Sequence, residues 1–222
     1  MVKLSDTQKR YLEKATNQYH ASLDGSAAES HLEKRGLLTP TTRTALSKYR
    51  LGFVEEPVPG HEQYKGMLAI PYLRWAPKAG WTVVSIRFRC LLEHQHGQPL
   101  CHKYNTVAGD TSRLYNTAAL LEDSDDVGIS EGEPDALSAT LSGIPTAGVA
   151  GAQGWKKHFT KAFLGYRTVF VFGDGDSAGR TFANKVASGL PNGRAVIMPD
   201  GEDVSSIVAS HGKQGLMKRI YR

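Results

Sequence analysis

The sequence predicts an α/β protein in two parts: a basic N-terminal subdomain over residues 1–120, helical over 1–50 and mixed α/β over 51–120, and a domain over 121–215 with a parallel sheet flanked by helices. Two observations carry this prediction. From residue 126 on, apolar runs of strand length alternate four times with helical patterns, which is typical of a parallel sheet. Residues 1–120 hold 16 Lys and Arg against 10 Asp and Glu, whereas residues 121–222 hold 11 against 12.

This charge division has two explanations. A basic part joined to a near-neutral part with clustered acids suits a protein that binds a polyanion with one part and performs metal-assisted chemistry with the other. Two surfaces that merely differ in lysine content explain it equally well.

The first 50 residues are predicted to form three helices. Ser5 and Gln8 have the spacing of a capping box, so a helix is expected from there to about His20. A second helix is expected over 28–35, where Gly36 ends it. A third, short helix begins at Pro40, because proline is favoured at the first helical position, and ends near residue 49.

Strand patterns follow the helical region. Residues 67–72 and 81–88 are predicted strands, with a turn at 78–80 between them. In the second part, the expected strands are 127–130, 146–150, 168–172 and 195–198, the expected helices are 134–142, 156–164, 177–190 and 204–210, and residues 216–222 are a C-terminal tail. The run 168–172 is continuously apolar, as in a strand covered on both faces.

Composition excludes several classes of protein. No apolar run approaches the roughly 20 residues that span a bilayer, and the N-terminus has no apolar signal segment, so no membrane is expected as a partner. Cys90 and Cys101 are the only cysteines, which excludes a disulfide scaffold and makes a cytoplasmic location the expectation.

Carboxylates follow three of the four expected strands of the second part. Glu131 follows the first, Asp174 and Asp176 the third, and the acidic segment 200–203 the fourth. Functional groups of such sheets collect beyond the carboxyl ends of the strands, and several carboxylate oxygens suit Mg²⁺ or Mn²⁺. The sequence therefore predicts a site for one of these ions, with zinc not expected.

Helix N-capping is the competing explanation for acids after strands. It is the larger part of the explanation for Asp135 and contributes at Asp203, but it fits Glu131 and the pair Asp174 and Asp176 poorly. Gly175, between the two aspartates, is expected to let a ligand approach the backbone.

Two motifs make the second part resemble a known superfamily. Residues 129–137, Ile-Ser-Glu-Gly-Glu-Pro-Asp-Ala-Leu, resemble the Toprim pattern of a strand, Glu-Gly, then Asp and a helix. Residues 170–180 resemble its D-x-D-x-x-G motif, 43 residues further on. Toprim domains occur in DnaG-type primases, in type IA and II topoisomerases and in some nucleases.

The first half is similar to a DnaG-type RNA polymerase domain. The segments that carry this likeness are 31–37 and 49–53 for its helical start, 67–71 and 84–89 for its two-strand segment, and 103–105 and 113–115 for its basic ridge. In the second part, residues 199–203 resemble the third acidic motif of the same family. The resemblance extends over about residues 28–215.

This resemblance implies a DNA primase catalytic core of a phage or small replicon, which makes short RNA primers on a single-stranded DNA template from NTPs by two-metal nucleotidyl transfer. It implies that Glu131, Asp174 and Asp176 are catalytic and hold the metals, with Asp135 and Asp203 as secondary acidic positions of the metal site. Nucleic-acid or NTP contacts are expected from Arg87, Arg89, Lys103, Tyr104, Asn105 and Arg113, since phosphate contacts dominate nucleic-acid affinity. A solvated strand face is the alternative for Arg87 and Arg89.

The sequence also departs from the family pattern. Ser205 stands where the third acidic motif usually has another Asp, and neither a C-x-x-C zinc ribbon nor a P-loop helicase motif is present. A replicative helicase or a separate zinc-containing protein is therefore an expected partner. One loop contains Cys90, His94, His96, Cys101 and His102, but their spacing is not that of a known zinc finger, and a polar hairpin tip explains them more simply.

Other functions remain open at this point. A Toprim nuclease would use Glu131 as base and the same metals to hydrolyse a phosphodiester. A DNA-binding replication accessory would keep the fold without activity, although clustered carboxylates without a use would cost stability. A topoisomerase is the least supported, because the chain has no room for a strand-passage domain.

Overall fold

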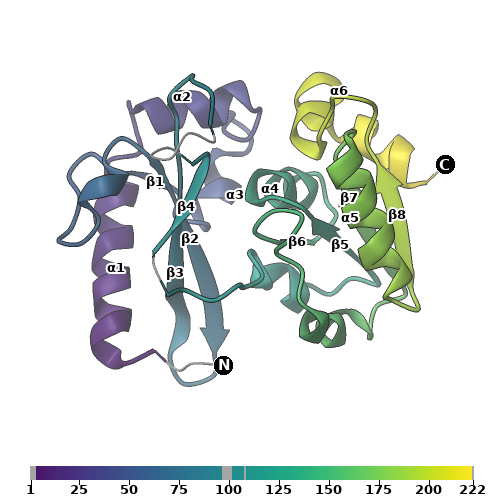
Figure 1. Cartoon of the computed structure of the whole chain (residues 1–222), viewed down its shortest axis with the longest axis horizontal. Helices are drawn as coiled ribbons and strands as arrows, with labels where there is room; N and C mark the ends of the chain where they lie inside the picture. Colours follow the sequence, from purple (N-terminus) through teal and green to yellow (C-terminus); the bar gives the residue numbers. More distant parts are fainter. Residues whose placement is uncertain (1–3, 97–101, 108, 222) are drawn as a thin grey trace. The chain divides into compact units, whose positions relative to one another are not determined.

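The computed structural model describes residues 4–96, 102–107 and 109–221. They form two compact units; apart from one short segment, the first runs from purple to teal and the second from green to yellow in Figure 1. The first contains the chain up to Lys34 and Arg43–Asp110, and the second contains Arg35–Thr42 and the chain from Thr111 on. The main division thus falls before the expected boundary at residue 120, and one short segment of the helical region folds with the second unit.

The first unit combines helices with an antiparallel sheet of order β1-β2-β3-β4. Its helices are α1 (Asp6–Ala21), α2 (Ala27–Lys34), α3 (Arg43–Ser47) and the 3-10 helix η1 (Glu62–Tyr64), and its strands are β1 (Gly52–Phe53), β2 (Leu68–Ala76), β3 (Gly80–Arg89) and β4 (Tyr104–Thr106). The predicted capping box is confirmed, because Gln8 N donates to Ser5 Oγ at 3.2 Å and Ser5 N to Gln8 Oε1 at 2.8 Å.

Helix α1 packs on this sheet through an aromatic core. Tyr19, Tyr64 and Phe88 are buried there, and the rings of Tyr64 and Phe88 stack with centroids 3.9 Å apart. Side chains alternate between the faces of a strand. With Ile86 and Phe88 of β3 in this core, Arg87 and Arg89 belong to the opposite face.

The second unit is built on a parallel sheet of order β6-β5-β7-β8. Its strands are β5 (Asp126–Ser130), β6 (Thr146–Gly148), β7 (Thr168–Gly173) and β8 (Gly193–Ile197), and its helices are η2 (Thr117–Leu121), α4 (Glu133–Leu141), η3 (Lys157–Phe163), α5 (Ser177–Ser188) and α6 (Val204–Ile220). The chain passes from β5 to β6 on one side and then to β7 on the other. The point where the strand order reverses therefore lies between the ends of β5 and β7.

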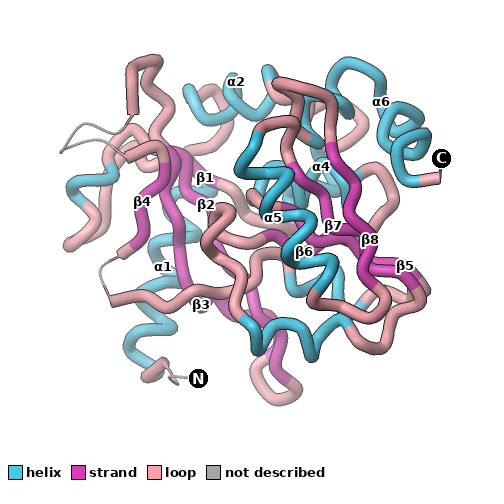
Figure 2. Tube along the Cα trace, turned by 45° about the vertical axis from the view of Figure 1, so that its right-hand side comes forward, coloured by secondary structure: helices cyan, strands magenta, loops and turns pink. Residues whose placement is uncertain are grey.

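Strand β7 is buried on both faces, as its continuous apolar run predicts. Val169 and Val171 pack against α5, whereas Phe170 and Phe172 belong to the core formed with α4 and α6. Figure 2 shows helices (cyan) against these strands (magenta). The prediction of a parallel sheet flanked by helices is confirmed.

Three details differ from the sequence prediction. The expected helix 156–164 is the 3-10 helix η3. Strands β1 and β4 were not predicted, because two or three residues are too few for a periodic pattern. Helix α6 continues through a kink at Gly212 to Ile220, so the expected tail at 216–222 is helical up to that residue, and its Leu216 and Ile220 are fully buried. Within the described residues, no helix is long and apolar enough to cross a membrane.

Candidate active site

The carboxylates predicted from the strand ends converge at the reversal point of the parallel sheet. Strands β5 and β7 are neighbours in register, with Ser130 opposite Phe172. Glu131 directly follows Ser130, and Asp174 directly follows the end of β7. Ligands of open α/β sheets bind at such a crevice beyond the carboxyl ends of the strands.

Glu131 is partly buried and is incompletely satisfied. Its Oε2 atom is buried and has no hydrogen-bond partner among the described residues. Burial raises the pKa of Glu131, and the charge of Asp176 raises it further, while a hydrogen bond from the backbone of Ala152 lowers it. Buried polar atoms are normally paired, so this oxygen is a ready acceptor for a cation or a donor.

Asp174 is influenced by the charges of three other acids of the site. Burial raises the pKa of Asp174 to about 7, and the charges of Glu131, Asp203 and Asp176 add to that rise. Acids from the ends of β5, β7 and β8 thus act on one another, and a divalent cation would relieve their repulsion.

Asp176 is exposed and caps helix α5. Its Oδ1 accepts from Gly179 N at 2.7 Å. The expectation that capping fits this residue poorly was wrong. A carboxylate has further lone pairs beyond this one bond, so the cap is compatible with an additional ligand.

Asp135 was expected to act mainly as a helix cap, and this expectation was wrong. The N-cap of α4 is Gly132, and Asp135 lies in the first turn of the helix. The buried carboxylate accepts from Ser205 N at 2.9 Å and from Ser205 Oγ at 3.0 Å. Burial and the charges of Asp203 and Asp174 raise the pKa of Asp135 to about 7. Asp135 therefore binds the start of α6 to α4.

Ser205 had been noted only for lacking the usual acid, and nothing in the sequence marked it as the partner of Asp135. Ser138 Oγ donates to Ser205 Oγ at 3.0 Å, which extends the buried network by one more hydroxyl.

Asp203 caps helix α6, as expected, by accepting from Ser206 N at 2.7 Å. It also pairs with Arg35 at 3.4 Å. Arg35 belongs to the segment that folds with the second unit, and its charge lowers the pKa of both Asp174 and Asp135. Sequence analysis missed this cation, because it is 168 residues away along the chain.

Glycines let the acidic segments approach one another. A Cβ at Gly175 would lie 1.7 Å from the carbonyl oxygen of Pro199, and Gly175 N donates to Glu202 O at 2.8 Å. A Cβ at Gly179 would lie 2.4 Å from Asp174 N. The structure explains Gly175 by packing between two backbones, rather than by the approach of a ligand.

These residues fit a hard divalent cation. They offer only oxygen ligands, one of them an unpartnered buried oxygen, in a site where like charges repel. Among the described residues, no three of these carboxylates bring one oxygen each within 4.8 Å of one another.

Two arginines of the first unit, Arg87 and Arg89, lie against Tyr104. The guanidinium of Arg87 lies 4.5 Å and that of Arg89 5.1 Å from the centroid of its ring, and Arg89 donates to its hydroxyl. Arg89 is only 8% exposed, so a solvated face does not explain it. Arg89 holds Tyr104 in place on the β3–β4 pair.

The other predicted contact residues occupy two different units. Lys103 is exposed, and its carbonyl oxygen accepts from Cys90 N at 3.0 Å. The amide of Asn105 donates to the carbonyl of His102 at 3.1 Å, which ties it to the loop. Arg113 is partly buried and belongs to the second unit. Of the loop residues considered for zinc, Cys101 lies outside the described residues.

The fold and the acidic edge together define the class of protein. Residues 128–208 match a family model described as Toprim-like. The whole chain has the fold of a DnaG-type primase catalytic core. It superimposes on the RNA polymerase domain of the primase DnaG of Mycobacterium tuberculosis with a TM-score of 0.75 at 17% identity, over 98% of this chain and 84% of that one. A DnaG primase catalytic domain solved with single-stranded DNA gives 0.69 at 20% identity, over 96% and 80%.

Comparison with related sequences gives the family of the chain. It is 54% identical to the gene 57 protein of Mycobacterium phage D29 over 157 residues, which cover 71% of this chain and 99% of that protein. The chain belongs to the same family as this phage protein. It is also 29% identical to a DNA primase of Pseudomonas aeruginosa over 130 residues, or 55% of this chain and 19% of that protein.

Proposed function

We propose that this chain is a DNA primase catalytic core that makes short RNA primers on single-stranded DNA from NTPs. The observation that carries the proposal is that acids of the Toprim pattern meet at the reversal point of a fold shared, over both units, with DnaG RNA polymerase domains. The relatives that are named for an activity are DNA primases, and one of them was solved with single-stranded DNA.

In this proposal, Glu131, Asp174 and Asp176 hold two divalent cations, Mg²⁺ or Mn²⁺, with Asp203 close by. When bound, the ions would supply charge stabilisation for the attacking 3′-hydroxyl and for the leaving pyrophosphate. The unpartnered oxygen of Glu131 and the raised pKa of Asp174 support these roles.

Other residues of the second unit position these acids. Asp135 receives both donors of Ser205, so it acts as an anchor for α6 rather than as a direct ligand. Arg35 moderates the negative charge around Asp203. Gly175 and Gly179 bring the segments that carry the acids into backbone contact.

The first unit supplies the contacts to template or triphosphate. Arg87 and Lys103 are the cations for phosphate, and Tyr104 offers a ring that Arg89 holds in place. Asn105, which pairs with Phe88 of β3, supports the loop through its hydrogen bond to His102. Arg113 would contribute from the second unit. We place the reaction in the host cytoplasm with a replicative helicase or a zinc-containing protein as partner, both on the family resemblance.

A nuclease would use the same acids, so the test must distinguish synthesis from cleavage. Single-stranded template of defined length is incubated with labelled NTPs and Mg²⁺ or Mn²⁺, and both strands are sized on a gel. Labelled RNA with an intact template supports the primase. A shortened template without labelled RNA would overturn the proposal and favour a nuclease.

A further inference from the structure

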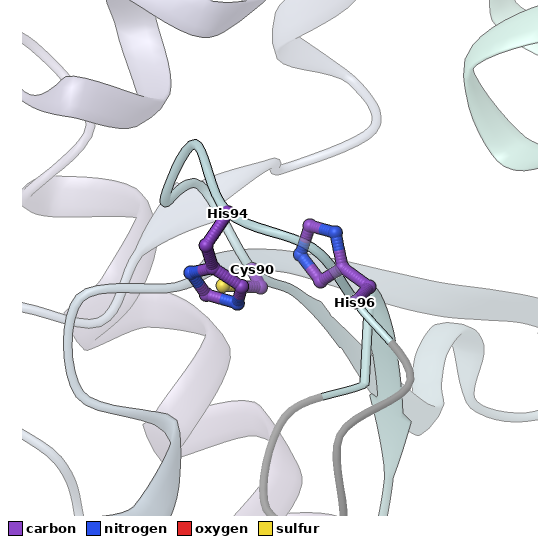
Figure 3. A group of neighbouring side chains, drawn as sticks. All are labelled: Cys90, His94 and His96. Atoms are coloured by element: carbon purple, nitrogen blue, oxygen red, sulfur yellow. The ribbon is translucent and has the colours of Figure 1, made fainter.

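The loop that leaves strand β3 gathers three potential metal ligands outside the acidic site. Cys90 directly follows β3, and His94 and His96 come from the loop that continues from it. In Figure 3 the sulfur of Cys90 is seen through the ring of His94, and the ring of His96 lies beside them. All three belong to the first unit.

The ligand atoms are close together. One atom from each residue, the sulfur of Cys90 and a ring nitrogen of each histidine, lies within 4.8 Å of the others. The ring centroids of His94 and His96 are 4.6 Å apart. Around tetrahedral zinc, such atoms are separated by about 3.3–3.6 Å, as follows from bond lengths of about 2.3 Å to sulfur and 2.0–2.1 Å to nitrogen. Small rotations of the exposed His94 side chain would bring its ring nitrogen closer to the other two ligand atoms, towards the separation found around zinc.

A second observation points to a ligand. The Nε2 atom of His96 is buried and has no hydrogen-bond partner in the described part of the chain. Burial lowers the pKa of His96, as do the charges of His94, Lys103 and Arg89. A neutral imidazole is the form that binds metals, so this shift of the pKa is in the direction that favours a ligand role.

We propose that Cys90, His94 and His96 form a site for a zinc-class divalent cation. A thiolate with two imidazoles selects zinc-like ions rather than Mg²⁺, so this site and the acidic site take different metals. Three protein ligands leave one coordination position for water or another donor. The nearby charges of Arg89 and Lys103 weaken cation binding, and the thiolate charge offsets them.

The sequence analysis did not expect zinc here, because no finger has this spacing. The fold, rather than the spacing, brings the ligands together: the end of β3 holds Cys90 in place, and the loop returns over it. Cys90 N donates to Lys103 O at 3.0 Å, so the residue after β3 is hydrogen-bonded to the residue before β4. A bound ion would hold residues 90–96 together at the end of β3, beside Lys103. Any effect of the bound ion on template contact by Lys103 rests on the proposed function. The proposal of metal binding itself does not rest on it.

Metal content tests the proposal directly. The chain is purified without a histidine tag, saturated with Zn²⁺, passed through gel filtration and analysed for zinc, and it is also loaded with Co²⁺ for absorption spectra. The variants are His94→Asn, whose side chain is exposed, and Cys90→Ala. The control is His211→Asn, an exposed histidine of α6. Asp174→Asn controls for ions at the acidic site.

Wild type, His211→Asn and Asp174→Asn are expected to retain about one equivalent of zinc, and His94→Asn to lose most of it. Co²⁺ should give a thiolate charge-transfer band in wild type that Cys90→Ala lacks, since carboxylates give no such band. Zinc content in His94→Asn equal to that of His211→Asn would overturn the proposal, whether or not Cys90→Ala folds. Loss of zinc in Asp174→Asn alone would overturn it as well.

Discussion

Asp135 accepts both donors of Ser205, the backbone N–H at 2.9 Å and the hydroxyl at 3.0 Å. The two residues join the first turn of α4 to the first turn of α6, and both are buried. A carboxylate at position 205 would repel Asp135, whereas the serine donates hydrogen bonds to it. The contact stabilises the acidic edge without needing a metal.

Ser205→Ala should destabilise the fold. It removes one of the two donors to Asp135 and also the acceptor of Ser138 Oγ. A buried polar group left without its partner lowers the free energy of unfolding by about 1–3 kcal/mol. Urea denaturation of the metal-free protein measures the loss. Ser188→Ala, at the end of α5 on an exposed residue, is the matched control. Equal unfolding midpoints for the two variants would contradict the assigned role.

The stability of the metal-free protein should depend on pH through Asp174. Its pKa is raised from 3.8 to about 7, so the folded state retains a proton that the unfolded state releases. The part of the free energy of unfolding that depends on this proton is therefore fully present below pH 4, and it is lost as the pH rises towards and through 7. His61, whose pKa burial lowers, gives the opposite slope in part of that window.

The difference between wild type and Asp174→Asn isolates this effect. In EDTA, the variant should gain melting temperature relative to wild type as the pH rises from 5.5 to 8, because the amide never ionises. Thermal melts at several pH values measure it. A difference that does not change with pH would show that Asp174 has an ordinary pKa.

Two substitutions of Asp176 should distinguish its role as a helix cap from its role in catalysis. Asn is as good an N-cap as Asp, so Asp176→Asn should keep the free energy of unfolding while losing primer synthesis. Asp176→Ala should lose both, with a cost of about 1 kcal/mol for the cap to Gly179. Urea denaturation and an NTP-incorporation assay measure the two effects. Near-wild-type synthesis by Asp176→Asn in Mg²⁺ would remove this residue from the metal site.

Binding of single-stranded DNA should be electrostatic and depend on Lys103. Each phosphate neutralised on a single strand contributes a log–log salt slope of about −0.7, and Lys103→Ala should weaken binding and reduce the slope by about that amount. Lys65→Ala is the control, an exposed lysine of the same unit that pairs with Glu56. Fluorescence anisotropy across a salt series measures both. An unchanged slope in Lys103→Ala would assign the phosphate contacts elsewhere.

The parts that the sequence predicts correctly are those with local signals. Glu131 and Asp174 follow apolar strands directly, so the parallel sheet places them without further information. Arg35 and Ser205 were missed because their partners lie 168 and 70 residues away. The second half of α6 was missed because Gly212 interrupts the helical pattern, although Leu216 and Ile220 bury their side chains beyond it.

The central claim is that the acids at the ends of β5 and β7 carry out primer synthesis. Incorporation of labelled NTPs on single-stranded DNA in Mg²⁺ is compared for wild type, Asp174→Asn and Asp125→Asn. Asp125 is an exposed carboxylate at the opposite end of β5, paired with Arg167 at 3.1 Å. We predict template-dependent RNA products for wild type and Asp125→Asn, and a loss of about 100-fold or more for Asp174→Asn, which is the range for removing a transition-state contact. Equal incorporation by all three proteins, or none by a folded wild type that binds single-stranded DNA, would contradict the account.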